Sequence, residues 1–382
     1  MSLARDIADL GAVTSRLDTV GGSSGALSNR NLIINGAMQV AQRGTSAATA
    51  NSSNEGYNTL DRWYILYSSS AGGAATMSQD TTVPNKSFTN SLKLDVTTAD
   101  TSVDVNHAIS LQCRIEAQDI ANSGWDYTNS NSNMSVSFWA RSVKAGTYCV
   151  FFLTDDGTQK SLVQEYTLEA NTWKYVTLTF KGDSGISFNN DNGLGLYVGW
   201  TLVAGSNRYQ SATAGTWIEK SSGNGQARYA TSNQVNFFDS TSNDFYLTGV
   251  QLEVGDIATD FEHRSFGDEL ARCQRYYHKI DAATAYSTLG TAALSTATIS
   301  TIYPFAGFNL RSVPTLESSG VSTFLLQCNN ANESVSALSI NGHASGQVPI
   351  CSCTHDSSTA GFAGSLIANN NAAAYIAFSS EL

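Results

Sequence analysis

Charged side chains are scarce in this chain. Asp, Glu, Lys and Arg make up 14% of its 382 residues, against about 25% in a typical globular protein. Ser, Thr, Asn, Gly and Ala are abundant instead. The strong helix formers Lys, Glu, Arg and Leu are scarce. This shortage argues against a mainly helical protein and favours strands that are joined by turns.

Basic clusters are also missing. The formal net charge is −11 and the pI is about 4.8, whereas a nucleic-acid binder needs grouped Lys and Arg side chains to displace counterions. An anionic membrane surface is disfavoured for the same reason. We therefore expect no nucleic-acid partner, and we expect neutral or cationic partners such as sugars.

Long apolar runs are absent. No stretch approaches the ~18 residues of a membrane-spanning helix, and "MSLARDIADLGAVTSRLDTVGG" at the N-terminus has no apolar signal-peptide core. We expect no membrane insertion and synthesis in a reducing cytoplasm. Cysteine is sparse and has no disulfide-scaffold spacing, so we expect free, mostly buried thiols and no cofactor. The cysteines are Cys113, Cys149, Cys273, Cys328, Cys351 and Cys353.

The first 30 residues contain one short apolar seam. Leu3, Ile7, Leu10 and Leu17 fall on heptad spacing, with Thr14 at the missing step. Such a helix is too short to be stable alone. It either packs on its own domain or joins partner chains, and we take 1–30 as an N-terminal anchor helix and linker.

Residues 31–262 are typical of an antiparallel β-sandwich. "NMSVSFWAR" alternates apolar Met134, Val136 and Phe138 with residues such as Trp139 on the other face. Similar strand patterns follow, separated by Gly, Asn and Asp turns. The sequence therefore predicts a mainly β protein whose largest part is a jelly roll.

Residues 263–282 carry a helical pattern between β-like regions. Leu270, Cys273, Tyr277 and Ile280 follow at spacings of 3, 4 and 3, which predicts an apolar stripe on a helix of about four turns. This connector helix would lie against the sandwich or form a seam between identical chains.

The sequence of residues 283–382 then predicts a β-sandwich-like domain. It has few large apolar residues, so burial against sister copies would help it fold.

Three stretches of the chain carry a resemblance to a known family. They are "NLIINGAMQVAQRGTS" with "LDRWYI", "SVSFWARSVKAGTYCVFF" with "YTLEANTWKYVTLTFKGD" and "NDNGLGLYVGWTLVAGS", and "YLTGVQLEVGDIATDFEHRSFGDELARCQRYY". Together they resemble tail-fibre and virion-surface fibre proteins of tailed bacteriophages. The C-terminal end is also similar to such fibres, so the similarity covers roughly residues 31–382. The resemblance implies a carbohydrate-binding-module-like jelly roll, a connector helix and a C-terminal trimeric domain. It also implies a homotrimer in the virion, with other virion proteins as partners.

Aromatic side chains are the candidates for sugar binding. Their faces stack on the apolar side of a pyranose, and loops collect binding residues. Trp139 lies on the polar face of its strand, opposite Phe138, as a platform residue would. Trp125 and Trp217 lie in Gly/Ser/Thr-rich stretches that are typical of loops. The candidates are Tyr57, Trp63, Trp125, Trp139, Tyr209 and Trp217.

One row of soft ligands lies near the C-terminus. Cys351, Cys353 and His355 share one face if "PICSCTHD" is a strand. No second ligand cluster with zinc-finger spacing accompanies the row. We therefore expect buried thiols and no metal.

The sequence favours a homotrimeric tail fibre that binds host-surface glycans and is not an enzyme. The fibre would be assembled in the host cytoplasm. A capsid fibre or decoration protein with weak adhesion is one alternative. A surface-glycan depolymerase is another, although neither an internal repeat nor a paired carboxylate motif supports it.

Overall fold

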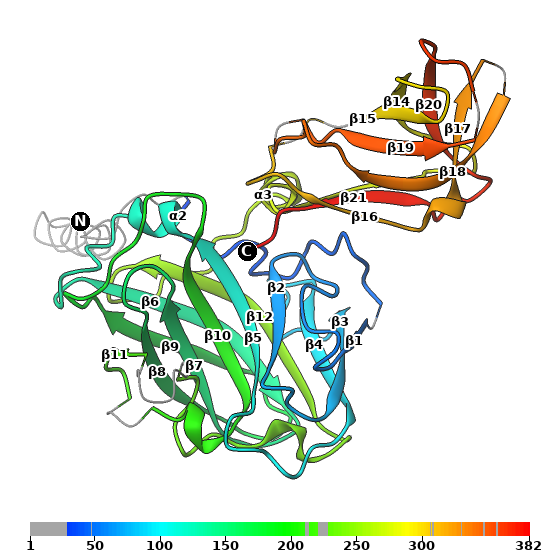
Figure 1. The fold of residues 1–382 in the computed structure, drawn as a ribbon. Helices are drawn as coiled ribbons and strands as arrows, with labels where there is room; N and C mark the ends of the chain where they lie inside the picture. Colours follow the sequence, from blue (N-terminus) through cyan, green and yellow to red (C-terminus); the bar gives the residue numbers. More distant parts are fainter. Residues whose placement is uncertain are drawn as a thin grey trace, which may run out of the picture. The chain divides into compact units, whose positions relative to one another are not determined.

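The computed structural model describes residues 29–382 apart from positions 47, 211–213, 221–227, 306, 308, 330, 347 and 357. The expected anchor residues Leu3, Ile7, Leu10 and Leu17 lie outside these described residues. Figure 1 shows the course of the chain, which is mainly β as predicted. The chain divides after Phe266 into two compact units, and each is described by itself. No helix in the described part is long and apolar enough to span a membrane.

The first unit is a sandwich of two antiparallel six-stranded sheets. The first sheet contains, in order, β1 (Ala48–Ala50), β3 (Ala74–Asp80), β4 (Ser91–Thr98), β12 (Asp244–Val254), β6 (Asn133–Ser142) and β9 (Lys174–Lys181). The second contains β11 (Ile218–Glu219), β8 (Lys160–Leu168), β7 (Gly146–Thr154), β10 (Leu194–Ala204), β5 (Ala108–Glu116) and β2 (Trp63–Ser68). Apart from the consecutive pairs β3–β4 and β7–β8, neighbouring strands in each sheet are not consecutive in sequence. The chain therefore passes repeatedly between the sheets in a jelly-roll-like way.

Short helices connect some of these strands. Helix α2 covers Ala117–Ala121, and the 3-10 helices η1 and η2 cover Ser206–Arg208 and Phe237–Asp239. Helix α2 follows β5 directly and closes one end of the second sheet with the buried Ile120. Strands therefore carry most of this unit, as the low content of charged helix formers predicts.

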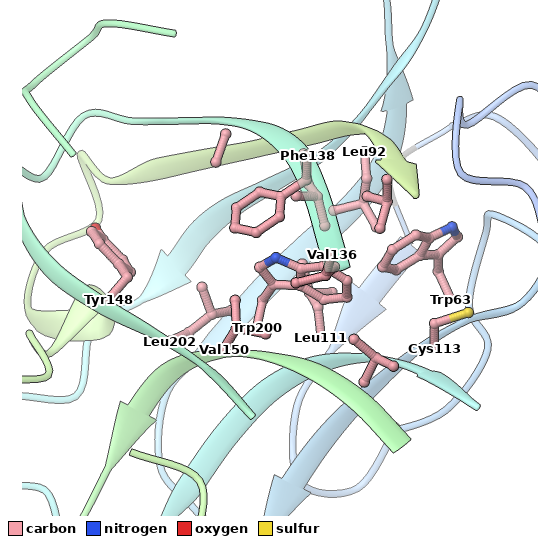
Figure 2. Close-up of a cluster of buried hydrophobic side chains, with 14 of the residues drawn as sticks. Trp63, Leu92, Leu111, Cys113, Val136, Phe138, Tyr148, Val150, Trp200 and Leu202 are labelled. Atoms are coloured by element: carbon pink, nitrogen blue, oxygen red, sulfur yellow. The ribbon is translucent and has the colours of Figure 1, made fainter. Parts of the chain in front are cut away.

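Large apolar side chains fill the space between the two sheets. Trp63, Phe138 and Trp200 have no exposed surface. The centroid of the Trp200 ring lies 5.4 Å from that of Trp63 and 5.5 Å from that of Phe138 (Figure 2). Because side chains alternate along a strand, burial of Phe138 places its neighbour Trp139 on the outer face of the first sheet.

The second unit contains a closed barrel and a three-stranded sheet. The predicted C-terminal sandwich is therefore corrected to a barrel. Every barrel strand pairs along both edges, so the sheet is closed. The apolar core of this unit combines large side chains such as Leu289 and Phe324 with small ones such as Cys353. The barrel order is β14 (Thr288–Leu294), β15 (Ile299–Pro304), β19 (Cys351–His355), β18 (Ala331–Ile340), β17 (Phe324–Cys328) and β20 (Ala363–Ala368). The small sheet contains β13 (Tyr277–Asp281), β21 (Tyr375–Ser379) and β16 (Thr315–Ser318), and η3 covers Val321–Thr323.

The connector helix is shorter than predicted. Helix α3 covers Phe266–Gln274, so Leu270 and Cys273 are helical, but Tyr277 and Ile280 are not. They lie in β13, where Ile280 is registered with Ile376 of β21. Strand pairing outweighs the helical spacing here, because the segment after Gln274 is rich in aromatic strand formers. Cys273 and Tyr277 are already buried within the single chain, so the four residues form no continuous helical seam.

Candidate binding site

Three of the predicted sugar-binding tryptophans are buried and are corrected here. Trp63, Trp125 and Trp217 are 0%, 2% and 8% exposed. The rings of Trp125 and Trp217 lie 5.7 Å and 6.2 Å from the ring of Phe180, inside the sandwich core. A pyranose needs an open ring face, so these residues stabilise the fold and offer no platform.

Tyr57 and Tyr209 are half-buried and lie elsewhere in the sandwich. The ring of Tyr57 meets that of Tyr64 edge to face at 5.2 Å, with the Arg43 guanidinium 5.6 Å from its centroid. Tyr209 packs at the margin of an apolar cluster that includes Phe151. Neither residue lines the groove that opens beside Trp139.

Trp139 is the predicted platform residue that the structure places on an outer sheet face beside other aromatic rings. On the neighbouring strand β9, Tyr175 is its registered partner and is 42% exposed. The two ring centroids lie 5.2 Å apart, with the planes 40° from parallel. Both side chains point outward because Phe138 and Val176, their neighbours along the strands, face the core.

A groove of about 490 Å³ opens beside this pair. Its volume lies within the range of small-ligand sites, roughly 300–1,000 Å³. Five of the side chains along it are aromatic rings. We call it the aromatic groove, and it is lined by Asn85, Ser87, Phe88, Trp139, Tyr175, Gly249, Asp260, Phe261 and His263.

The far wall of the aromatic groove is a cluster of three rings. The ring of Phe88 lies 5.3 Å from that of Phe261 and 5.5 Å from that of His263. Phe261 and His263 are 4.9 Å apart at a steep angle. The loop before β4 and the segment after β12 thus supply one wall, and β6 and β9 supply the other.

Gly249 allows the two walls to meet. Strand β12 shifts register between Thr248 and Gln251, and Gly249 adopts a positive φ of 62° in this bulge. A Cβ at this position would lie 2.6 Å from the Phe88 ring and 3.2 Å from the Trp139 ring. Only glycine therefore fits both the backbone and the close approach of the rings.

Buried polar groups hold the segment that carries Phe261 and His263. The carboxylate of Glu253, which is 2% exposed, accepts from the N–H of Thr259 at 2.8 Å and from its hydroxyl at 2.7 Å. The N–H of Glu262 donates to the Gln251 side chain at 2.7 Å. These contacts fix the chain on both sides of Asp260.

Glu262 joins this segment to the start of the described chain. It accepts from the N–H of Asn31 at 2.9 Å, and the Arg264 guanidinium lies 3.2 Å away and also donates to the Ile33 carbonyl. Burial alone would raise the pKa of Glu262, but the Asn31 N–H and the Arg264 charge outweigh it and lower the pKa. We call these paired segments, residues 29–33 and 259–264, the terminal clamp.

The predicted soft-ligand row lies inside the barrel. Burial raises the pKa of the Cys351 and Cys353 thiols to about 12, so both are neutral near pH 7. His355 Nδ1 is 2.6 Å from the carbonyl of Asp356, and its Nε2 is 2.9 Å from the Ser300 hydroxyl. Both ring nitrogens therefore have partners. Within the described ranges, no group of three or more His, Cys, Asp or Glu is placed to hold a metal ion.

The sequence predicted part of the aromatic groove and missed the rest. Phe88, Tyr175 and Asp260 were not candidates. The alternation of Tyr175 with the buried Val176 was an available signal. For Phe261 and His263 the signal was weaker: both lie in the third phage-like stretch, next to the buried Gln251 and Glu253.

All six cysteines are free and buried, as expected.

Comparisons with known proteins give weak structural similarities. An enzymatically active domain of a bacteriophage CBA120 tailspike protein has 13% identity and a TM-score of 0.31, over 59% of this chain and 21% of that one. A family 11 carbohydrate-binding module from Clostridium thermocellum, in complex with a mixed-linked tetrasaccharide, has 13% identity and a TM-score of 0.27, over 53% and 91%. TmCBM61 in complex with β-1,4-galactotriose has 11% identity and a TM-score of 0.25, over 59% and 98%.

Neither a protein-family model nor a curated protein sequence matches the chain. This chain spans about a fifth of the tailspike domain to which it is similar. All three TM-scores lie below 0.5, so the description of the sandwich rests on its own sheets and their register.

Proposed function

We propose that the first unit binds a surface glycan in the aromatic groove, without catalysis. The observation that carries this proposal is the outward pair Trp139 and Tyr175, with ring centroids 5.2 Å apart beside a groove of about 490 Å³. Two adjacent rings on rigid strands offer a preformed apolar platform for sugar rings, while Asn85 and Ser87 offer hydrogen bonds to hydroxyl groups.

The composition of the aromatic groove supports binding over hydrolysis. Among the described residues that line it, Asp260 is the only carboxylate. Glycoside hydrolysis usually needs two carboxyl groups that flank the scissile bond. If the chain were a depolymerase, its pair of catalytic carboxyl groups would therefore have to lie outside this groove.

We further propose that the chain is a homotrimeric fibre protein of a tailed bacteriophage. The resemblance of roughly residues 31–382 to phage fibre proteins supports this assignment. The last 100 residues carry only five charged side chains, which favours burial of the second unit against sister copies. Three weak glycan sites on one fibre would then act together through avidity. The N-terminal residues Leu3, Ile7, Leu10 and Leu17 would attach the fibre to the virion.

Glycan screening with matched variants tests the binding proposal. Trp139→Ala and Tyr175→Ala should each weaken binding of the best oligosaccharide at least tenfold. Trp173→Ala is the control, because Trp173 is also partly exposed near the start of β9 but does not line the aromatic groove. Binding that survives both groove variants would exclude this groove as the glycan site.

Antibody labelling of intact virions tests the location. Label at the tail would support a receptor-binding fibre. Label over the head would favour a capsid fibre or decoration protein, and label on neither would contradict a virion role.

A further inference from the structure

Fixed charge in the aromatic groove is negative. Among the described lining residues, Asp260 is the only Asp or Glu, and none is Lys or Arg. The Arg30 guanidinium donates to the Asp260 backbone carbonyl and lies 3.5 Å from the Glu253 carboxylate. Glu253 thus offsets the charge of Arg30. With a net charge of −11 over the whole chain, the surroundings attract cations and repel anions.

Neighbouring rings in each wall are inclined to one another. Trp139 and Tyr175 are inclined by 40° to each other, and Phe88 and Phe261 by 66°. The face of an aromatic ring carries partial negative charge and attracts a cation within about 6 Å of its centroid. Rings that meet at such angles around a groove can surround a rounded cationic group from several directions.

The polar side chains of the groove are few compared with its rings. A neutral sugar carries several hydroxyl groups, and each loses hydrogen bonds to water when it is buried. Asn85, Ser87 and Asp260 are the polar side chains of the lining that are not rings. His263 and Tyr175 add an imidazole and a hydroxyl group to an otherwise apolar ring surface. An alkylated ammonium has an apolar surface and a diffuse charge, so it suits a site of rings with one carboxylate.

We propose that the aromatic groove takes a ligand group with a positively charged, alkylated nitrogen, such as a trimethylammonium group on a surface glycan. Asp260 supplies the counter-charge, while the outward rings of Trp139 and Tyr175 supply ring faces. The inference rests on the proposed function, because it names the part of the glycan that this same groove selects. The charge of the ligand, in addition to its shape, then determines affinity.

Choline and its neutral isostere 3,3-dimethylbutan-1-ol separate charge from shape. Titration of the full chain with each compound by calorimetry or NMR should give choline an affinity about tenfold higher, since one or two cation–π contacts contribute about 0.5–2 kcal/mol each. Asp260→Asn should lower choline affinity several-fold and leave the alcohol unchanged. Asp256→Asn is the control, because Asp256 is exposed nearby but does not line the groove. Trp139→Ala should weaken both compounds.

The outcomes distinguish this inference from the proposed function. Equal affinity for choline and the alcohol would overturn it, as would an Asp260→Asn variant that binds choline normally. If a neutral oligosaccharide then still binds in a Trp139-dependent manner, the glycan site stands and only the ammonium preference falls. If neither choline nor any oligosaccharide binds, both proposals fall together.

Discussion

Replacing Gly249 by alanine should both destabilise the first unit and weaken ligand binding. The positive φ of 62° at this position costs a non-glycine residue roughly 1–2 kcal/mol. The new Cβ would also lie 2.6 Å from the Phe88 ring, which must then move out of the position where it is 6% exposed. Full burial of a phenylalanine contributes about 1.5–3 kcal/mol. The two contributions together give an expected loss of unfolding free energy of about 2.5–5 kcal/mol.

Tryptophan fluorescence during urea denaturation measures this loss in the intact chain. All six tryptophans precede residue 267, so their signal reports the first unit alone. Gly124→Ala is the matched control: its φ is 86°, but no atom lies within 4 Å of the added Cβ. It should lose only the backbone contribution and keep its affinity for ligand. If Gly249→Ala loses no more unfolding free energy than Gly124→Ala, the close approach of Phe88 to Gly249 does not shape the groove.

Three further predictions concern the clamp, the thiols and a corrected tryptophan. Because the folded pKa of Glu262 is lowered, its contribution to stability is present above its ordinary pKa of 4.5 and is lost as the pH falls through the folded value. Denaturation at several pH values should therefore show weaker acid dependence in Glu262→Gln, and an unchanged pH profile would contradict this role. Cys351 and Cys353, with pKa values raised to about 12 by burial, should react with a thiol reagent only after unfolding; rapid labelling of the native protein would show that the barrel opens. Trp125→Ala should lower the unfolding free energy by about 3–5 kcal/mol while the folded fraction keeps its ligand affinity, and a specific loss of binding would restore Trp125 as a contact residue.

Alternation along strands made the orientation of Trp139 predictable. It did not help with Trp125 and Trp217, which lie outside the long strands. Their stretches are rich in turn residues, as expected for loops, but composition does not reveal whether a loop ring points outward or back into the core. Here the rings pack around Phe180, because large apolar surface is better buried than exposed.

Other parts of the site and fold depend on contacts between distant segments. Phe88 and Phe261 meet at 5.3 Å although more than 170 positions separate them, and no local pattern indicates that pairing. Likewise, the spacing of Leu270, Cys273, Tyr277 and Ile280 predicts one helix. In the structure, Tyr277 and Ile280 instead pair with the strand formed by residues 375–379. Pairing between distant segments therefore determines the secondary structure here, and a local sequence pattern does not indicate which segments will pair.

The terminal clamp has a mechanical consequence. The chain enters the sandwich at residues 29–33 and leaves it at residues 259–264, and these two segments are bonded through Glu262 and Arg264. Tension applied between the N-terminal residues and the second unit is therefore transmitted across a few short bonds, without stretching the strands of the sandwich. The roughly 230 residues between these segments lie outside the line of force, whereas Asp260, Phe261 and His263 belong to the clamp and also line the groove. Tension on the clamp therefore acts directly on one wall of the groove, and ligand affinity should depend on load.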